Sequence, residues 1–161
     1  LCAMQSGNPG AFSVIPAHAR LVGTVRTFRP NTQDLIERRL HELVRSIATA
    51  FGARATLDYQ RVYPPTINHA AEAEFAAQVA ETLVGRDNVV RNLDPSMGAE
   101  DFSFMLQAKP GAFARLGQGG AEDGAFLHSS RYDFNDSVLP LGAAYLAALA
   151  KRAMPLPESA G

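Results

Sequence analysis

The chain has 161 residues, 47% of them hydrophobic, which is enough for one ordinary domain or two small ones with a core. Its 15 Lys and Arg against 16 Asp and Glu give a net charge of -1, which argues against nucleic acid or an anionic membrane as a partner. No apolar run approaches the roughly 18 residues that cross a bilayer, and no secretory signal pattern is present, so we expect a cytoplasmic protein. The single cysteine, Cys2, excludes a multi-cysteine metal site.

The first third of the chain predicts a small sheet with one helix. Leu1–Met4 is strand-like without a polar lead-in, which leads us to expect a fragment. Residues alternate between the two faces of a strand over Ala17–Phe28 and again over Ala53–Val62, which predicts two half-buried strands. Between them, apolar residues recur every three or four positions over Leu35–Phe51 and stop at Gly52, which predicts a helix. The expected order is therefore β-β-α-β.

This order is about half of the β-α-β-β-α-β split sandwich found in ferredoxin-like domains. The proline-containing stretch Tyr63–Asn68 cannot continue a strand and marks a candidate domain boundary. After it, the pattern predicts helices over Ala70–Leu83 and Pro140–Ala153, a short helix beginning near Phe102, and a buried strand over Ala112–Leu116. The predicted elements are therefore a mixture of helices and strands, and the first part is α+β.

Three places could carry chemistry. His128 follows an apolar pair and precedes a polar run, where a strand end can direct an imidazole into a cleft, although a lone histidine is more often structural. Glu100 and Asp101 stand at an expected helix start, where capping alone explains them. Arg26 lies on the more polar face of its strand, where it can bind a substrate carboxylate or simply be solvated.

Two other patterns are weaker. The glycine-rich stretch Gly117–Gly120 lacks the Walker spacing and a following helix, so a flexible loop explains it better than a phosphate site. Ser129 and Ser130 lie beside His128, but no nucleophile-elbow motif surrounds them. Neither pattern predicts an activity.

Several segments, taken in order along the chain, carry a resemblance to a known family: Phe12–Pro16, Gly23–Phe28, Met97–Met105, Leu127–Ser129, Phe134–Asp136 and Leu139–Gly142. Together they resemble the C-terminal part of the aminoacylase/carboxypeptidase family of two-metal amidohydrolases, in particular its branch of hippurate hydrolases and indole-acetyl-amino-acid hydrolases. The resemblance spans nearly the whole chain and implies a metallopeptidase-like hydrolase that cleaves the amide bond of small N-acyl amino acids.

The same resemblance implies two domains. Residues 1–64 look like a ferredoxin-like lid without its first strand and helix, and such a lid often carries the contact of a homodimer. Residues 67–161 look like the C-terminal segment of the α/β catalytic domain. The cofactors of the whole enzyme would be two divalent metal ions, for which His and carboxylate ligands suit Zn, Mn, Co or Ni.

By resemblance, His128 matches the histidine that supplies the last protein ligand to one metal ion. Arg26 matches a lid arginine that binds the free carboxylate of the substrate. Ser13 stands where the family has an asparagine at the scissile amide, which puts that contact in doubt. In the same way, a loop of the family that borders the cleft is matched here by Gly98, Ala99 and Glu100.

The family's other metal ligands and its catalytic glutamate belong to sequence before Leu1. The chain therefore offers no general base, and we expect it to be inactive on its own and to bind no metal tightly. A different class of function stays open, a stand-alone ferredoxin-like binding or dimerisation module without catalysis. A His-x-Asp motif in frame upstream of Leu1 would favour the enzyme, whereas a start codon at Leu1 would favour the module.

Overall fold

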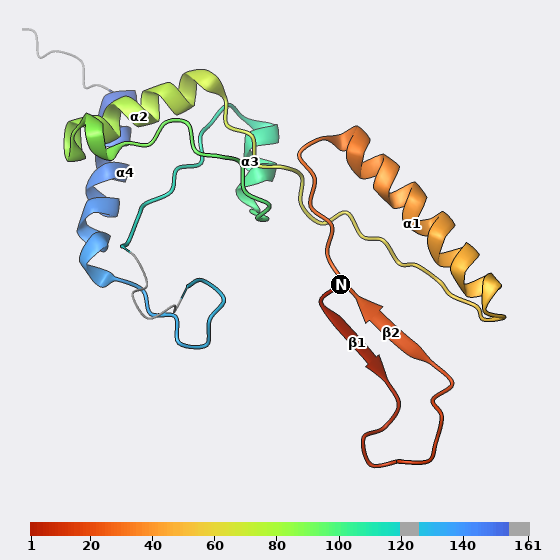
Figure 1. Cartoon of the computed structure of the whole chain (residues 1–161). Coiled ribbons are helices and arrows are strands. Elements are labelled where there is room, and N and C mark those ends of the chain that lie inside the picture. The colour runs from red at the N-terminus through yellow and green to blue at the C-terminus, as the bar shows by residue number, and fades with distance from the viewer. Residues whose placement is uncertain (120–125, 155–161) are drawn as a thin grey trace, which may run out of the picture. The chain divides into compact units, whose positions relative to one another are not determined.

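A computed structural model of the chain describes residues 1–119 and 126–154. These residues fall into two compact units that we describe separately (Figure 1). Unit 1 is Leu1–Pro65 with Ser96–Ala99, and unit 2 is Thr66–Pro95 with Glu100–Gly161. Among the described residues, no helix is long and apolar enough to cross a membrane.

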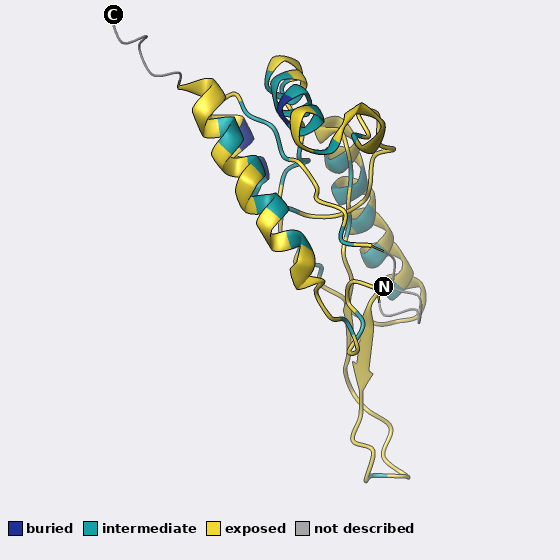
Figure 2. Ribbon diagram, turned by 90° about the vertical axis from the view of Figure 1, so that its left-hand side faces the viewer, coloured by how far each residue is buried: buried dark blue, intermediate teal, exposed yellow. Residues whose placement is uncertain are grey.

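Unit 1 begins with an antiparallel hairpin of β1 (Ala3–Ser6) and β2 (Ala19–Val22), in which Ala3 lies opposite Val22. The second strand is shorter than the expected Ala17–Phe28, because only the residues that face β1 find backbone hydrogen-bond partners. Both strands are exposed along their whole length, as the yellow ribbon of Figure 2 shows.

The helix expected to stop at Gly52 is confirmed as α1 (Pro30–Ala50). Pro30 lies in the first turn, where a missing backbone N–H breaks no helical hydrogen bond. Gly52 has a φ of +66°, and its N–H donates to the carbonyl oxygen of Thr49 at 3.0 Å. A left-handed glycine ends the helix here without the steric cost that a side chain would add.

The third strand expected over Ala53–Val62 does not form. Arg61 in this segment pairs with Asp34 at 2.7 Å and with Glu37, both on α1, and the segment runs beside that helix in Figure 1. Within the described residues, however, no strand pairs with it, and a strand is stabilised by hydrogen bonds to a neighbour about 4.8 Å away. Unit 1 is therefore β-β-α with an extended tail, a mixed α and β arrangement.

The helices expected in unit 2 are confirmed as α2 (Ala70–Val84), α3 (Phe102–Ala108) and α4 (Leu139–Ala153). Two short 3-10 turns, η1 (Arg86–Asn88) and η2 (Asp136–Val138), accompany them. Helix α2 packs against α4: the Tyr145 hydroxyl donates to the carbonyl oxygen of Ala76 at 3.1 Å, and burial raises the pKa of Tyr145. Val79 is buried on α2, and Ser103 and Leu106 are buried on α3.

The strand expected over Ala112–Leu116 is also absent, and a side chain takes the place of a neighbouring strand. The Asn68 amide donates to the carbonyl oxygen of Phe113 at 2.9 Å and accepts from its N–H at 2.8 Å. These are the two backbone groups that a strand partner would use. The Phe113 ring lies 5.8 Å from that of Phe102, so the segment is fixed to α3 without a sheet.

Much apolar surface lies uncovered in unit 1. In the loop between β1 and β2, Phe12 is 98% exposed and Ile15 92% exposed, and on α1 Leu43 and Ile47 are exposed as well. Exposed apolar surface and unpaired strand edges favour association with other chains. We therefore expect the chain to form dimers or larger species at micromolar concentration, measured by sedimentation velocity. Sedimentation as a monomer alone would contradict this expectation.

Candidate functional site

His128 lies in a tight turn, whereas the sequence analysis expected it at the end of a strand. The Ser129 N–H donates to the carbonyl oxygen of Phe126 at 2.9 Å, and His128 has a φ of +70°, the one positive φ among the described residues other than glycine. This third turn position favours glycine in type II turns. A left-handed non-glycine residue costs about 1–3 kcal/mol. One turn hydrogen bond contributes about 0.5–1.5 kcal/mol net. Ser129 adds two local bonds, accepting from the Tyr132 N–H at 3.1 Å through its carbonyl oxygen and from the Arg131 N–H at 3.2 Å through its hydroxyl, and contacts over a longer range add to these.

Such contacts join the two ends of the His128 loop. The Gln118 side-chain oxygen accepts from the Tyr132 hydroxyl at 3.2 Å and from the Asn135 N–H at 3.3 Å. The Asn135 side-chain amide donates to the carbonyl oxygen of Gln118 at 2.8 Å. We call Gln118, Tyr132 and Asn135 the loop clamp. The sequence analysis missed it, because Gln118 stands in the stretch interpreted only as a flexible glycine-rich loop.

Glu100 makes the capping contact that the sequence left open. Its carboxylate accepts from the Phe102 N–H at 3.3 Å, and its carbonyl oxygen accepts from the buried Ser103 hydroxyl at 2.6 Å. The N-cap position of α3 belongs to Asp101, whose side chain makes no capping bond. Gly98 and Ala99 are exposed and are grouped with unit 1, whereas Glu100 begins the second part of unit 2.

Arg26 and Ser13 are both exposed in unit 1. Arg26 follows β2, and its guanidinium donates to the carbonyl oxygen of Val25 at 3.2 Å. No carboxylate of the described residues pairs with this guanidinium, so its charge is available to an anionic group. Ser13 lies in the loop between β1 and β2.

The predicted site residues are divided between the two units. Arg26 and Ser13 belong to unit 1 and His128 to unit 2, and in residues 1–119 and 126–154 no hydrogen bond joins two of them. Within the same ranges, no group of three or more His, Cys, Asp or Glu side chains is arranged to hold a metal ion. The exposed imidazole of His128 suits one ligand position, but one ligand does not make a metal site.

Among the described residues, two arginines each pair with two carboxylates, and neither network includes a predicted site residue. In unit 1, Arg61 joins the extended segment to α1, as described above. In unit 2, Arg91 pairs with Glu81 at 2.9 Å and with Glu74, both on α2. The pKa of Glu74 is lowered mainly by a hydrogen bond from Gln78 and, to a smaller extent, by one from Arg91. The pKa of Arg91 is raised mainly by its hydrogen bond to Glu81 and, to a smaller extent, by that to Glu74. These exposed pairs tie a connecting segment to a helix.

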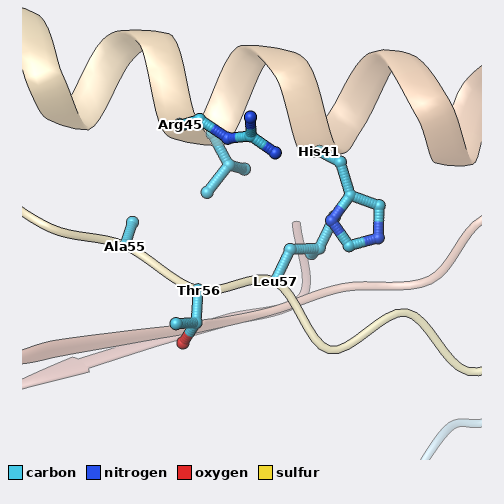
Figure 3. Close-up of a pocket in the computed structure, with 6 residues that line it drawn as sticks. His41, Arg45, Ala55, Thr56 and Leu57 are labelled. Atoms are coloured by element: carbon cyan, nitrogen blue, oxygen red, sulfur yellow. The ribbon is translucent and has the colours of Figure 1, made fainter.

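The sequence analysis also missed a shallow pocket of about 230 Å³ in unit 1, between α1 and the extended segment. Figure 3 shows His41 and Arg45, one helical turn apart, above Thr56 and Leu57 of that segment. The pocket offers cationic and hydroxyl groups beside an apolar wall. It shares no residue with the predicted site. The lining is His41, Val44, Arg45, Ala55, Thr56 and Leu57.

Comparison with known proteins confirms the resemblance seen in the sequence. Residues 4–152 match the peptidase family M20/M25/M40. The chain belongs to this family. Its members generally depend on divalent metal ions.

Several characterised relatives match most of the chain. Hippurate hydrolase from Campylobacter jejuni is 35% identical over 140 residues, which cover 87% of this chain and 36% of that protein. IAA-amino acid hydrolase ILR1-like 4 from Arabidopsis thaliana is 35% identical over 149 residues, or 89% and 34% of the two chains. Thermostable carboxypeptidase 1 from Saccharolobus solfataricus is 33% identical over 141 residues, or 86% and 35%. The chain thus spans about a third of the length of these relatives. No solved structure gives a significant match.

Proposed function

We propose that the chain is part of a metal-dependent amidohydrolase that cleaves the amide bond of N-acyl amino acids. The observation that carries this proposal is the likeness, over 87–89% of the chain, to a hippurate hydrolase and an IAA-amino acid hydrolase. Hippurate is N-benzoylglycine, and a conjugate of indole-acetic acid with an amino acid has the same connection of acyl group, amide and free carboxylate. A substrate of this class needs a cationic group for its carboxylate and a hydrolytic centre at its amide.

Arg26 is the proposed carboxylate-binding residue. Its guanidinium is exposed and is bonded only to a neighbouring carbonyl oxygen among the described residues, which supports this role. An arginine can bind a carboxylate through two parallel charge-assisted hydrogen bonds. Ser13 is proposed to contact the substrate near the scissile amide, with a hydroxyl in place of the family's longer asparagine side chain.

His128 is the proposed ligand to one of two divalent ions, which when bound polarise a carbonyl group and activate a water molecule. Its imidazole has no hydrogen-bond partner among the described residues, and this supports the assignment. Its left-handed backbone supports it as well, because strained backbone persists mainly at functional positions. The loop formed by Gly98, Ala99 and Glu100 is proposed to border the cleft, with Glu100 fixed by its contact to the start of α3.

The proposed organisation is a lid over residues 1–64 and a segment of the catalytic domain over residues 67–161. The exposed apolar residues of unit 1 support a homodimer formed through the lid. A small N-acyl amino acid is the expected substrate, and the cytoplasm is the expected location.

The function is tested on the longer protein that contains this chain. We expect it to hydrolyse hippurate and other N-acyl amino acids in the presence of Zn, Mn or Co, with product amino acid measured by chromatography. Absence of hydrolysis across acyl groups and metals would contradict the proposal.

The 161-residue chain on its own should show no turnover of the same substrates at saturating metal. The reason is that His128 alone cannot form a chelating cage, and the described residues supply no further ligands. Equilibrium dialysis should likewise detect no tightly bound metal. Turnover that copurifies with the chain through successive columns would refute this expectation.

A further inference from the structure

The loop clamp is not used by the function proposed above, yet it lies at both ends of the loop that carries His128. Its three hydrogen bonds connect Gln118 to Tyr132 and Asn135, which are 14 and 17 residues further along the chain. Within the turn, the Ser129 N–H donates to Phe126, the Ser129 carbonyl oxygen accepts from the Tyr132 N–H at 3.1 Å, and the Ser129 hydroxyl accepts from the Arg131 N–H at 3.2 Å. These bonds link the left-handed turn at His128 to Tyr132, and the clamp holds Tyr132 through its hydroxyl. Because a left-handed residue persists only where its surroundings hold it, the clamp acts as a restraint on this turn.

We infer that Gln118 and Asn135 are positioning residues, which close this loop and thereby hold His128 in its left-handed turn. The inference rests on the proposed function only for what His128 does. The clamp itself stands on the hydrogen bonds of the described residues.

Asn135 also connects the clamp to the helices of unit 2. Its side-chain oxygen accepts from the Ser137 N–H at 3.1 Å and from the Ser137 hydroxyl at 2.7 Å, at the start of η2. The chain then continues directly into α4, which packs against α2. The amide nitrogen of Asn135 thus serves the clamp, whereas its oxygen serves the helix start. An imidazole held from a rigid base samples fewer orientations, which favours productive geometry at a site.

Because the nitrogen and the oxygen of the Asn135 amide have separate partners, two chemically matched variants can be compared, Gln118→Glu and Asn135→Asp. Each replaces an amide by a carboxylate and adds one negative charge. Gln118→Glu keeps the oxygen that accepts both bonds from Tyr132 and Asn135. Asn135→Asp keeps the oxygen that caps η2 but removes the donor to Gln118 and places a carboxylate oxygen against a carbonyl oxygen. Only the second variant should break a bond of the clamp, the one from the Asn135 side chain to the Gln118 carbonyl oxygen.

The measurement is amide hydrogen exchange by mass spectrometry on the purified protein that contains the chain. We expect Asn135→Asp to speed exchange of the Ser129 and Tyr132 amides by roughly three- to tenfold, the effect of one lost hydrogen bond. Gln118→Glu should exchange as the wild type does. Amides of α2 and α4 should be unchanged in both variants.

Three results would overturn the inference. The first is unchanged exchange at Ser129 in Asn135→Asp. The second is faster exchange in Gln118→Glu of the same size, which would make the added charge the cause. The third is an equal rise across α2 and α4, which would make Asn135 a general stability residue.

Hydrolysis of hippurate by the same proteins separates this inference from the proposed function. If the wild type is active, Asn135→Asp should lower kcat with little change in KM or in the unfolding temperature, and Gln118→Glu should retain activity. A fall in the unfolding temperature that accounts for the lost activity would overturn the positioning role. If the wild type is inactive on every N-acyl amino acid, the proposed function fails, and the exchange result alone decides the clamp.

Discussion

Replacing His128 with alanine in the proposed hydrolase should abolish nearly all activity. A catalytic metal ion contributes several kcal/mol of transition-state stabilisation, and each 1.4 kcal/mol is a factor of ten, so kcat/KM should fall by more than about 100-fold. Metal content, measured by inductively coupled plasma mass spectrometry after dialysis, should fall with it. The substitution removes no buried packing contact, because His128 is exposed.

His41→Ala is the matched control. His41 is an exposed histidine on α1 in the other unit, and it lines the shallow pocket and not the predicted site. This control should keep full metal content and activity. Normal metal content and activity in His128→Ala would show that His128 is a turn residue without a ligand role.

Replacing Arg26 with alanine should lower kcat/KM by roughly ten- to a hundredfold while metal content stays unchanged. A paired arginine and carboxylate in a closed cleft contribute about 1.5–3 kcal/mol, because charge-assisted hydrogen bonds there face little competition from water. Arg26→Lys should recover only part of the loss, since an ammonium group retains the charge but not the planar pair of donors. Steady-state kinetics with hippurate measure both effects.

The decisive comparison uses a substrate whose carboxylate has been converted to an amide. Wild type and Arg26→Ala should process this neutral substrate almost equally if the guanidinium binds the carboxylate. Arg20→Ala, which changes an exposed arginine on β2, should leave both substrates unaffected. If Arg26→Ala slows the charged and the neutral substrate by the same factor, Arg26 is a structural residue and its assignment is wrong.

The helices of this protein can be predicted from its sequence. The predicted ranges Ala70–Leu83 and Pro140–Ala153 differ from α2 and α4 by a single residue at one end. Gly52 and Gly85, both with positive φ, follow α1 and α2, and Gly52 ends its helix as expected. A helix forms its backbone hydrogen bonds within one segment, so a local pattern of apolar residues and a terminal glycine are sufficient to predict it.

The strands were predicted less well, because alternation of side chains describes one strand only, whereas a strand forms by pairing with another. The segment Ala53–Val62 has the pattern of a strand but no neighbouring strand among the described residues, and Arg61 ties it to α1. The backbone of Phe113, in another expected strand, is bonded by the Asn68 side chain from 45 residues away. The tertiary structure decides which hydrogen-bond donors and acceptors lie beside a segment, and a local stretch of sequence does not show them.

At the site, the sequence by itself determined the family, because its motifs are short runs of neighbouring residues such as those around Glu100 and His128, and the match over residues 4–152 confirms it. Only the tertiary structure decided the left-handed turn at His128 and the clamp of Gln118 and Asn135. The physical reason is that a strained backbone angle costs energy locally and persists only when distant groups hold it. Those groups lie 14–17 residues apart along the chain and become neighbours only when the loop closes.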